Sequence, residues 1–337
     1  MQILYAGGTD VGKVRDHNED SYAILAEQNL AMVCDGMGGH AAGEVASQLA
    51  VETITAIIKE HDLDLFTGDS LPYPEELTPE GKLLVGAIAI ANQRIIDCAN
   101  QSSSHTGMGT TVVACHFKDG VVSICHVGDS RAYLIRNGNI KRVTIDHSWV
   151  SEVMEKHNLT EEESENLVNR NVITRALGTR TAVRTDISQI RFARGDMFLL
   201  CSDGLCGLVS DTDILKTSTS CEEDLGRLVQ ELTAKANEAG GSDNITLVVA
   251  KVVDQEELSD FDEVRRVTVD WNEDNQIARI AEVIAAKFPP EPEIPPTPAG
   301  ATANFTVPTS KERGISPVLW LLILIVGLTA IAFIIFK

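Results

Sequence analysis

The chain has 337 residues, and its 49 acidic and 28 basic side chains give a formal net charge of −21. This negative charge repels nucleic acid and anionic lipid, so it argues against nonspecific binding to either and favours cations as partners. Because 44% of the residues are hydrophobic, the chain can bury a sizeable core, which excludes a disordered protein.

The cysteines and the first residues indicate the compartment. Seven cysteines are scattered without a Cys-x-x-Cys pair, and several lie inside apolar runs, where free cysteine acts as a small hydrophobe. This usage favours a reducing environment. Residues 1–10 lack a charged start followed by a long apolar run, so we expect no signal peptide and a cytoplasmic location for the folded part of the chain.

The N-terminal part of the chain predicts strands followed by two long helices. Two short strands are expected within residues 1–25, around an ionisable loop at 12–21, and the apolar run 30–34 predicts a buried strand. Apolar residues at helical spacing then predict helices over 41–59 and 82–99.

From residue 107 the pattern changes to that of strands. The runs 109–117, 121–131 and 132–136 alternate with turn sequences and predict an antiparallel meander. The polar, helical segment 146–169 interrupts this region, and we expect it to form a flap that shapes protein substrates. Later strands are predicted at 182–192, 197–201 and 245–253, with a helix at about 221–238.

Beyond residue 253 the composition becomes that of a tether. Residues 254–263 hold six acidic and no basic side chains, and residues 288–308 hold seven of the eleven prolines. Such segments cannot bury a core, so we predict an acidic and then Pro-rich linker over 254–314. Within it, residues 265–287 can hold a short strand and a helix.

The last residues predict a membrane span. Residues 315–336 carry no charged side chain, and a helix of this length matches the hydrocarbon thickness of a bilayer. Lys311 and Arg313 precede this segment and only Lys337 follows it, so the positive-inside bias keeps the rest of the chain in the cytoplasm. The predicted parts are thus a folded domain (1–253), a linker (254–314) and a single C-terminal transmembrane helix (315–336).

Three aspartates stand where predicted strands begin or end. Asp35 and Asp203 each follow an apolar run, and Asp243 immediately precedes the final strand. If antiparallel strands bring these positions to one edge of a sheet, the carboxylates must either be protonated or hold metal. Oxygen ligands of this kind suit Mg²⁺ or Mn²⁺, whereas the alternative interpretation is three unrelated turn aspartates.

Six short motifs now stand in order along the chain: Arg15–Asp20, Asp35–His40, Gly109–Thr111, Gly128–Arg131, Ser202–Leu205 and Ser242–Asn244. This ordered set resembles the metal-dependent Ser/Thr protein phosphatases of type 2C (the PPM family), in their bacterial form, over about residues 5–252. The resemblance implies an α+β fold in which a central antiparallel β-sandwich is flanked by helices in α-β-β-α layers. It also implies a dinuclear Mg²⁺ or Mn²⁺ site at one end of the sandwich.

The resemblance assigns metal ligands position by position. Asp35 would bridge both metals, the carbonyl of Gly36 would serve one of them, and Asp203 and Asp243 would serve the other. A hydroxide bridging the two ions would then attack phosphorus in line, without a phosphoenzyme.

Three further acids match positions around these ligands. Glu19 and Asp20 would hold metal-bound waters, and Asp129 matches a third, weaker metal position. For Asp129 the alternative is a turn aspartate bonded to the backbone.

Two residues are candidates for handling the phosphate itself. Arg15 matches the phosphate-binding position, because its planar fork suits two phosphate oxygens, and the alternative is an ion pair with a neighbouring acid. In animal members a histidine directly follows the Asp-Gly pair, but here Met37 occupies that position. His40 is therefore the candidate general acid or substrate-positioning residue, against a structural role.

The sequence thus predicts a membrane-tethered phosphatase acting on phosphoserine and phosphothreonine in proteins. Its expected partners are phosphorylated proteins, including a membrane Ser/Thr kinase and the substrates of that kinase. The alternative from another class is a catalytically weak, membrane-tethered adaptor that binds phosphoproteins. Retention of clustered charge at Asp35, Asp203 and Asp243 favours the enzyme, because an adaptor does not need it.

Overall fold

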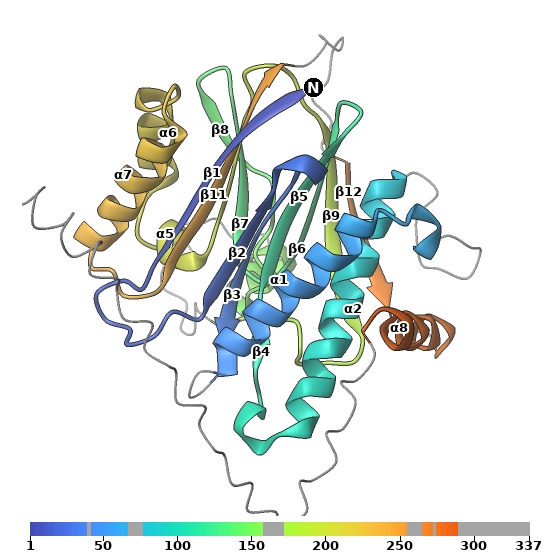
Figure 1. The fold of residues 1–337 in the computed structure, drawn as a ribbon. Helices are drawn as coiled ribbons and strands as arrows, with labels where there is room; N and C mark the ends of the chain where they lie inside the picture. Colours follow the sequence, from blue (N-terminus) through green and yellow to red (C-terminus); the bar gives the residue numbers. More distant parts are fainter. Residues whose placement is uncertain (39–41, 67–76, 158–171, 255–264, 272–273, 289–337) are drawn as a thin grey trace, which may run out of the picture. The chain divides into compact units, whose positions relative to one another are not determined.

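Two antiparallel β-sheets form the centre of the fold (Figure 1). The computed structural model describes residues 1–38, 42–66, 77–157, 172–254, 265–271 and 274–288. The five-stranded sheet has the order β1 (Gln2–Asp10), β11 (Ile245–Asp254), β10 (Met197–Cys201), β7 (Arg131–Arg136) and β8 (Asn139–Arg142).

The seven-stranded sheet carries the other strands. Its order is β12 (Arg265–Trp271), β9 (Val183–Arg191), β6 (Val121–Val127), β5 (Val112–Lys118), β3 (Leu30–Met37) and β2 (Asp20–Leu25), with β4 (Gly109–Thr110) paired to β3. The α-helices are α1 (Ala42–Glu60), α2 (Pro79–Gln101), α3 (Trp149–His157), α5 (Asp203–Cys206), α6 (Asp211–Ser220), α7 (Leu225–Glu238) and α8 (Asp274–Lys287).

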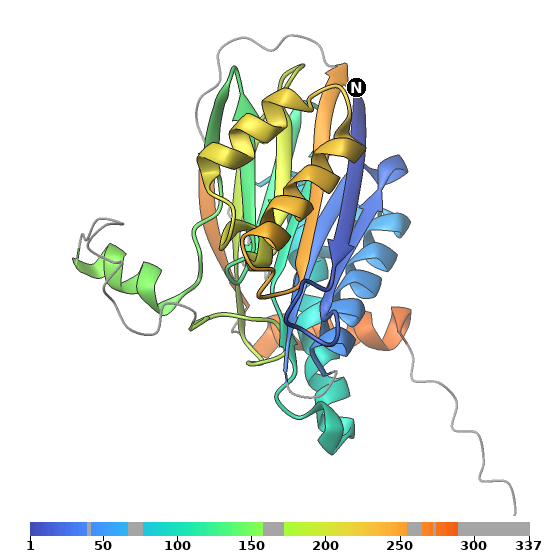
Figure 2. The ribbon, with the colours of Figure 1, turned by 90° about the vertical axis from the view of Figure 1, so that its left-hand side faces the viewer.

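Three buried apolar layers hold these elements together, one between the two sheets and one on the outer face of each sheet. Successive strand residues point to opposite faces of a sheet, so each strand contributes to two of these layers. On β3, Met32 packs with α1 and α2, whereas the adjacent Val33 points between the sheets. On β11, Val248 faces the space between the sheets, whereas Val249 packs under α7. Figures 1 and 2 show α1 and α2 on one side of the sandwich and α6 and α7 on the other, which confirms the predicted α-β-β-α layers.

Local sequence signals explain where helices α2 and α6 begin. The Thr78 side chain accepts a hydrogen bond from Gly81 N at 3.1 Å, and Pro79 occupies the first turn, so α2 begins earlier than residue 82. Helix α6 was not predicted, because its Thr- and Ser-rich sequence has a weak helical propensity. The side chain of Ser210 caps this helix, and buried Ile214 packs in the same apolar layer as α7.

The predicted meander is wrong in one respect. Strand β6 pairs with β5 and β9, whereas β7 belongs to the other sheet and pairs with β10 and β8. The chain changes sheets at residues 128–130. Gly128 has a φ of +111°, and a Cβ there would lie 2.6 Å from the Thr111 side chain, so this crossing requires glycine.

The packed part of the chain extends beyond residue 253. Strand β12 pairs with β9, and fully buried Trp271 meets Phe66 edge-on, with ring centroids 6.1 Å apart. The Arg94 guanidinium lies 4.0 Å from the centroid of the Phe288 ring. The short strand and helix expected within residues 265–287 are thus present as β12 and α8. Because they bury large apolar side chains against the domain, the packed part of the chain continues to Phe288, into the range predicted as linker.

The predicted membrane span falls outside the described residues, as do residues 289–314 of the linker. Among the helices that the structure describes, none is long and apolar enough to cross a membrane.

Candidate metal centre

Asp35 lies near the end of β3, and the backbone around it is held from two sides. In the register of β2 and β3 it stands opposite Asp20. Its N–H donates to Thr111 Oγ1 at 3.0 Å, and its carbonyl accepts from Thr111 N at 2.8 Å and from Thr110 Oγ1 at 2.9 Å. The segment carrying Asp35 is therefore held in place by backbone and hydroxyl contacts, which leave its carboxylate available.

Gly36 allows two segments of backbone to approach this strand end. A Cβ at this position would lie 2.3 Å from the carbonyl oxygens of both Glu19 and Gly43. Gly36 N donates to the Glu19 carbonyl at 3.1 Å. Any larger residue would push away the loop that carries Glu19. Glycine is therefore required here because the backbones approach so closely, and not because of a positive φ.

Asp203 and Asp243 come from the paired strands β10 and β11. Asp203 is the first residue of α5, directly after β10, and Asp243 lies just before β11. A Cβ on Gly204 would lie 2.0 Å from the carbonyl oxygen of Asn244, so the two turns touch. Ser202, the residue before Asp203, donates to Asp20 Oδ2 at 2.9 Å, and Asp20 stands opposite Asp35, so these strand ends lie close together.

Asn244 is a residue whose role the sequence reasoning missed. Its Oδ1 accepts from Glu19 N at 2.8 Å, and its Nδ2 donates to the carbonyls of Val11 and His17 at 3.0 and 2.9 Å. A single amide thereby fixes the N-terminal loop beside Asp243. Its place in the Ser-Asp-Asn motif is the signal that could have found it, because only an amide side chain offers both a donor and an acceptor here.

Several carboxylate oxygens at this centre lack a partner. Ser202 Oγ donates to Asp20 Oδ2 at 2.9 Å. Within the described part of the chain, the Oδ1 atoms of Asp20, Asp129 and Asp203 are buried and accept no hydrogen bond. Buried polar atoms are rarely left without a partner, so these three oxygens require a cation or water.

The negative charges of these groups repel one another. Burial, followed by the charges of Asp20, Asp203, Asp129 and Asp243, raises the pKa of Asp35 well above its usual value. Burial also raises the pKa of Asp20 and of Asp129 to about 7, and the Asp203 charge acts in the same direction on both. A divalent ion would supply partners for the oxygens and neutralise their charge, and the all-oxygen donor set fits Mg²⁺ or Mn²⁺.

Of the two residues predicted to act on the phosphate, the structure describes Arg15 but not His40. Arg15 Nη2 lies 2.8 Å from Asp243 Oδ2, so this arginine makes the ion pair that was its alternative interpretation. Its side chain is 49% exposed, which leaves the guanidinium accessible to a substrate phosphate. His40 lies outside the described residues.

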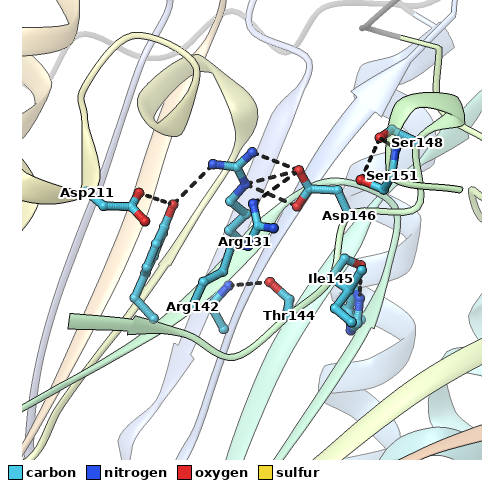
Figure 3. Close-up of polar contacts among 11 residues, drawn as sticks. Arg131, Arg142, Thr144, Ile145, Asp146, Ser148, Ser151 and Asp211 are labelled. Carbon is cyan, nitrogen blue, oxygen red and sulfur yellow. Dashed lines mark hydrogen bonds and ion pairs between the residues drawn. The ribbon is translucent and has the colours of Figure 1, made fainter. Parts of the chain in front are cut away.

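Arg131 and Asp146 join the sheet crossing to the start of the expected flap (Figure 3). Arg131 Nη2 lies 2.7 Å from Asp146 Oδ2, and its Nη1 donates to the Tyr133 hydroxyl at 3.3 Å. That hydroxyl donates to Asp211 Oδ1 at 3.0 Å. Helix α3 lies within the expected flap, and residues 158–171 fall outside the description.

A second polar cluster satisfies the distances of a metal site. His126, His147 and Asp186 each offer a ligand atom within 4.8 Å of the others. However, His126 Nε2 lies 2.8 Å from the Ile145 carbonyl, and His147 Nδ1 accepts from Gly128 N at 3.1 Å. These imidazole nitrogens already have partners, so the aspartate centre fits a divalent ion better.

Comparison with known proteins agrees with these features. The family model described as Protein phosphatase 2C matches residues 8–247. The serine/threonine phosphatase stp of Listeria welshimeri is 36% identical over 249 residues, covering 72% of this chain and 93% of that protein. Serine/threonine protein phosphatase PstP of Mycobacterium tuberculosis is 37% identical over 257 residues, covering 75% of this chain and 46% of that protein.

A solved structure provides the corresponding metal evidence. The catalytic domain of PstP has been solved in complex with two manganese ions, and it is 35% identical to this chain. The match covers 75% of this chain and 99% of the solved domain, with a TM-score of 0.62. The family model spans most of the sequence, and the fold and the acidic centre agree with it. This chain belongs to the protein phosphatase 2C family of metal-dependent serine/threonine protein phosphatases.

Proposed function

We propose that this chain hydrolyses phosphoserine and phosphothreonine in proteins, using two divalent ions held by the aspartate centre, and that it does so tethered to the cytoplasmic face of a membrane. The observation that carries the catalytic part is the set of buried, partnerless oxygens on Asp20, Asp129 and Asp203 beside Asp35. The two manganese ions of PstP support the same class of metal.

The roles proposed for the residues follow from where they lie. Asp35, the Gly36 carbonyl, Asp203 and Asp243 would hold the ions, which supply an acidified water and charge neutralisation when bound. Asp243 also holds the Arg15 guanidinium beside the centre, through their 2.8 Å ion pair. The exposed guanidinium would then bind the substrate phosphate.

The acids around these ligands have supporting roles in the proposal. Glu19 and Asp20 would accept hydrogen bonds from water at the centre, and Asp129 would serve a third, weaker ion. Asn244 would keep Glu19 in place through its bond to the Glu19 N–H.

The test is phosphate release from a phosphothreonine peptide by the purified full-length chain. We expect release in Mn²⁺ or Mg²⁺ and none in EDTA, and we expect Asp203→Asn to abolish it. Binding of the phosphopeptide without turnover by the metal-loaded wild-type chain would instead support the adaptor alternative.

Substitution of Arg15 should weaken substrate binding more than folding. We expect Arg15→Ala to lower kcat/KM for a phosphopeptide by about 10- to 100-fold, mainly through KM, because a charge-assisted hydrogen bond is worth about 1.5–3 kcal/mol. The unfolding midpoint should change little, because half-exposed ion pairs contribute little stability. Steady-state kinetics measure the effect, and Arg227→Ala, which removes an exposed ion pair to Glu231, is the matched control. An unchanged KM would exclude a phosphate-binding role.

His40 remains the proposed proton donor or substrate-positioning residue. Steady-state kinetics of His40→Ala on a phosphopeptide, measured from pH 5 to 9, test this role. A loss of the basic limb of the profile would support proton donation. An unchanged rate and profile would leave His40 without a role in the reaction.

The membrane tether rests on the uncharged segment 315–336 and the Pro-rich sequence before it. We expect the full-length chain to fractionate with membranes and to resist extraction by alkaline carbonate. Substrates would then be phosphoproteins at the membrane, including a Ser/Thr kinase. Replacing two apolar residues of the segment by lysine should release the protein, and recovery of the wild-type chain in the soluble fraction would contradict the tether.

A further inference from the structure

Three separate parts of the chain meet at the Asp186 carboxylate on β9. His147 Nε2 lies 3.2 Å from its Oδ2, Arg175 Nη1 donates to its Oδ1 at 3.2 Å, and Thr268 Oγ1 donates to the same Oδ1 at 2.8 Å. Burial opposes ionisation, but the hydrogen bonds from His147 and Thr268 hold the pKa of Asp186 well below its usual value. Asp186 is therefore a buried anion with three donors.

The hydrogen bonds of His147 define its tautomer. Gly128 N–H donates to Nδ1 at 3.1 Å, so that nitrogen is unprotonated, and Nε2 lies 3.2 Å from Asp186 Oδ2 and 3.2 Å from Arg175 Nη1. The ring stacks on His126, with centroids 4.5 Å apart. Burial, followed by the neighbouring His147, lowers the pKa of His126 to about 4, so the stacked partner is neutral. Asp186 thus orients the His147 ring in one state.

His147 holds both backbone polar groups of Gly128. In addition to the bond at Nδ1, His147 N–H donates to the Gly128 carbonyl at 2.9 Å. The next residue is Asp129, with its partnerless buried Oδ1, and the Ser130 hydroxyl lies 2.7 Å from that of Thr111. Thr111 is the residue that anchors the backbone of Asp35, so the Gly128–Ser130 turn connects the His147 pair directly to the metal centre.

The third donor to Asp186 comes from outside the part of the chain that the family model matches. That match ends at residue 247, whereas Thr268 lies on β12, opposite Asp186 in the register of β12 and β9. Arg266 Nη2 on the same strand donates to the Val143 carbonyl at 2.6 Å. Strand β12 lies at the edge of the seven-stranded sheet (Figure 1). Through Thr268 it contacts the network that holds the turn.

We propose that His147 and Asp186 are positioning residues that set the Asp129 carboxylate against the aspartate centre, and that Thr268 makes the divalent-ion affinity of this centre depend on β12. The inference rests on the proposed function in one respect, because it requires that the centre bind divalent ions. It assigns strand β12, which lies beyond the residues that the family model matches, a role in the metal site and not only in linking the domain to the end of the chain.

Calorimetric titration of the metal-free full-length chain with Mn²⁺ tests this directly. We expect Thr268→Val and Asp186→Asn to weaken at least one class of Mn²⁺ site by about three- to tenfold. This is less than the roughly 10- to 100-fold typical of residues that contact a metal ligand directly, because both act through His147 and the Gly128–Ser130 turn. In an Asp129→Asn background Thr268→Val should have no further effect, because the contribution passes through Asp129. His147→Leu should reproduce the loss, and His147→Asn, whose amide oxygen can accept from Gly128 N, should restore part of it.

The control is Asp270→Asn, which removes the 3.6 Å ion pair to Arg184 on the same two strands without touching Asp186. It should leave the Mn²⁺ isotherm unchanged. A wild-type chain that binds no Mn²⁺ would overturn the proposed function. A wild-type chain that binds Mn²⁺ with an isotherm unaffected by Thr268→Val, or equally affected in the Asp129→Asn background, would overturn this inference alone.

Discussion

Replacing Asp35 by asparagine is expected to lower kcat on a phosphothreonine peptide by about 10³-fold or more, since the loss of a metal ligand removes several kcal/mol of transition-state stabilisation. The same variant should stabilise the metal-free protein by about 1–3 kcal/mol, because the amide removes a buried charge repelled by other aspartates. Phosphate release and thermal unfolding in EDTA measure the two effects.

The opposite signs of these effects make the experiment specific. A merely disruptive substitution would lower both activity and stability, whereas removal of a metal ligand should separate them. Asp97→Asn, an exposed carboxylate that accepts from Gln93 on α2, is the matched control and should change neither quantity. A full-rate Asp35→Asn enzyme would contradict the metal assignment.

Removing the metal is expected to make stability fall as pH rises. The pKa of Asp20 and of Asp129 is about 7 in the folded chain, against about 4 for an aspartate in an unfolded chain. Between these values the folded state binds more protons, so the free energy of unfolding decreases as pH rises through that window. In EDTA we expect the midpoint to drop by about 5 °C or more between pH 5 and 8, and Mn²⁺ to restore it.

Buried histidines act in the opposite direction and must be separated from this effect. Burial lowers the pKa of His116 and of His126 to about 4, so their contribution to stability is present above about pH 6.5 and is lost as pH falls toward 4. The difference between the wild-type chain and Asp20→Asn in EDTA isolates the carboxylate. If both chains show the same pH profile, the raised pKa of Asp20 is excluded.

Local sequence patterns predicted the strands and helices whose buried faces show in their own apolar residues. The continuous apolar run 30–34 indicates a strand covered on both faces, and the Asp-Gly at its end indicates a turn toward a cleft. What these patterns lack is the identity of the neighbouring strand. For that reason β7 was predicted beside β6, although the Gly128 crossing carries it to the other sheet.

The sequence by itself determined the strand ends that carry Asp35, Asp203 and Asp243, because periodicity, glycine turns and motif order are properties of short segments. Only the tertiary structure decided which residues support them. Asn244, the His147–Asp186 pair and Thr268 act through hydrogen bonds between positions far apart in the chain. Such contacts are set by sheet pairing and packing, which no local pattern encodes.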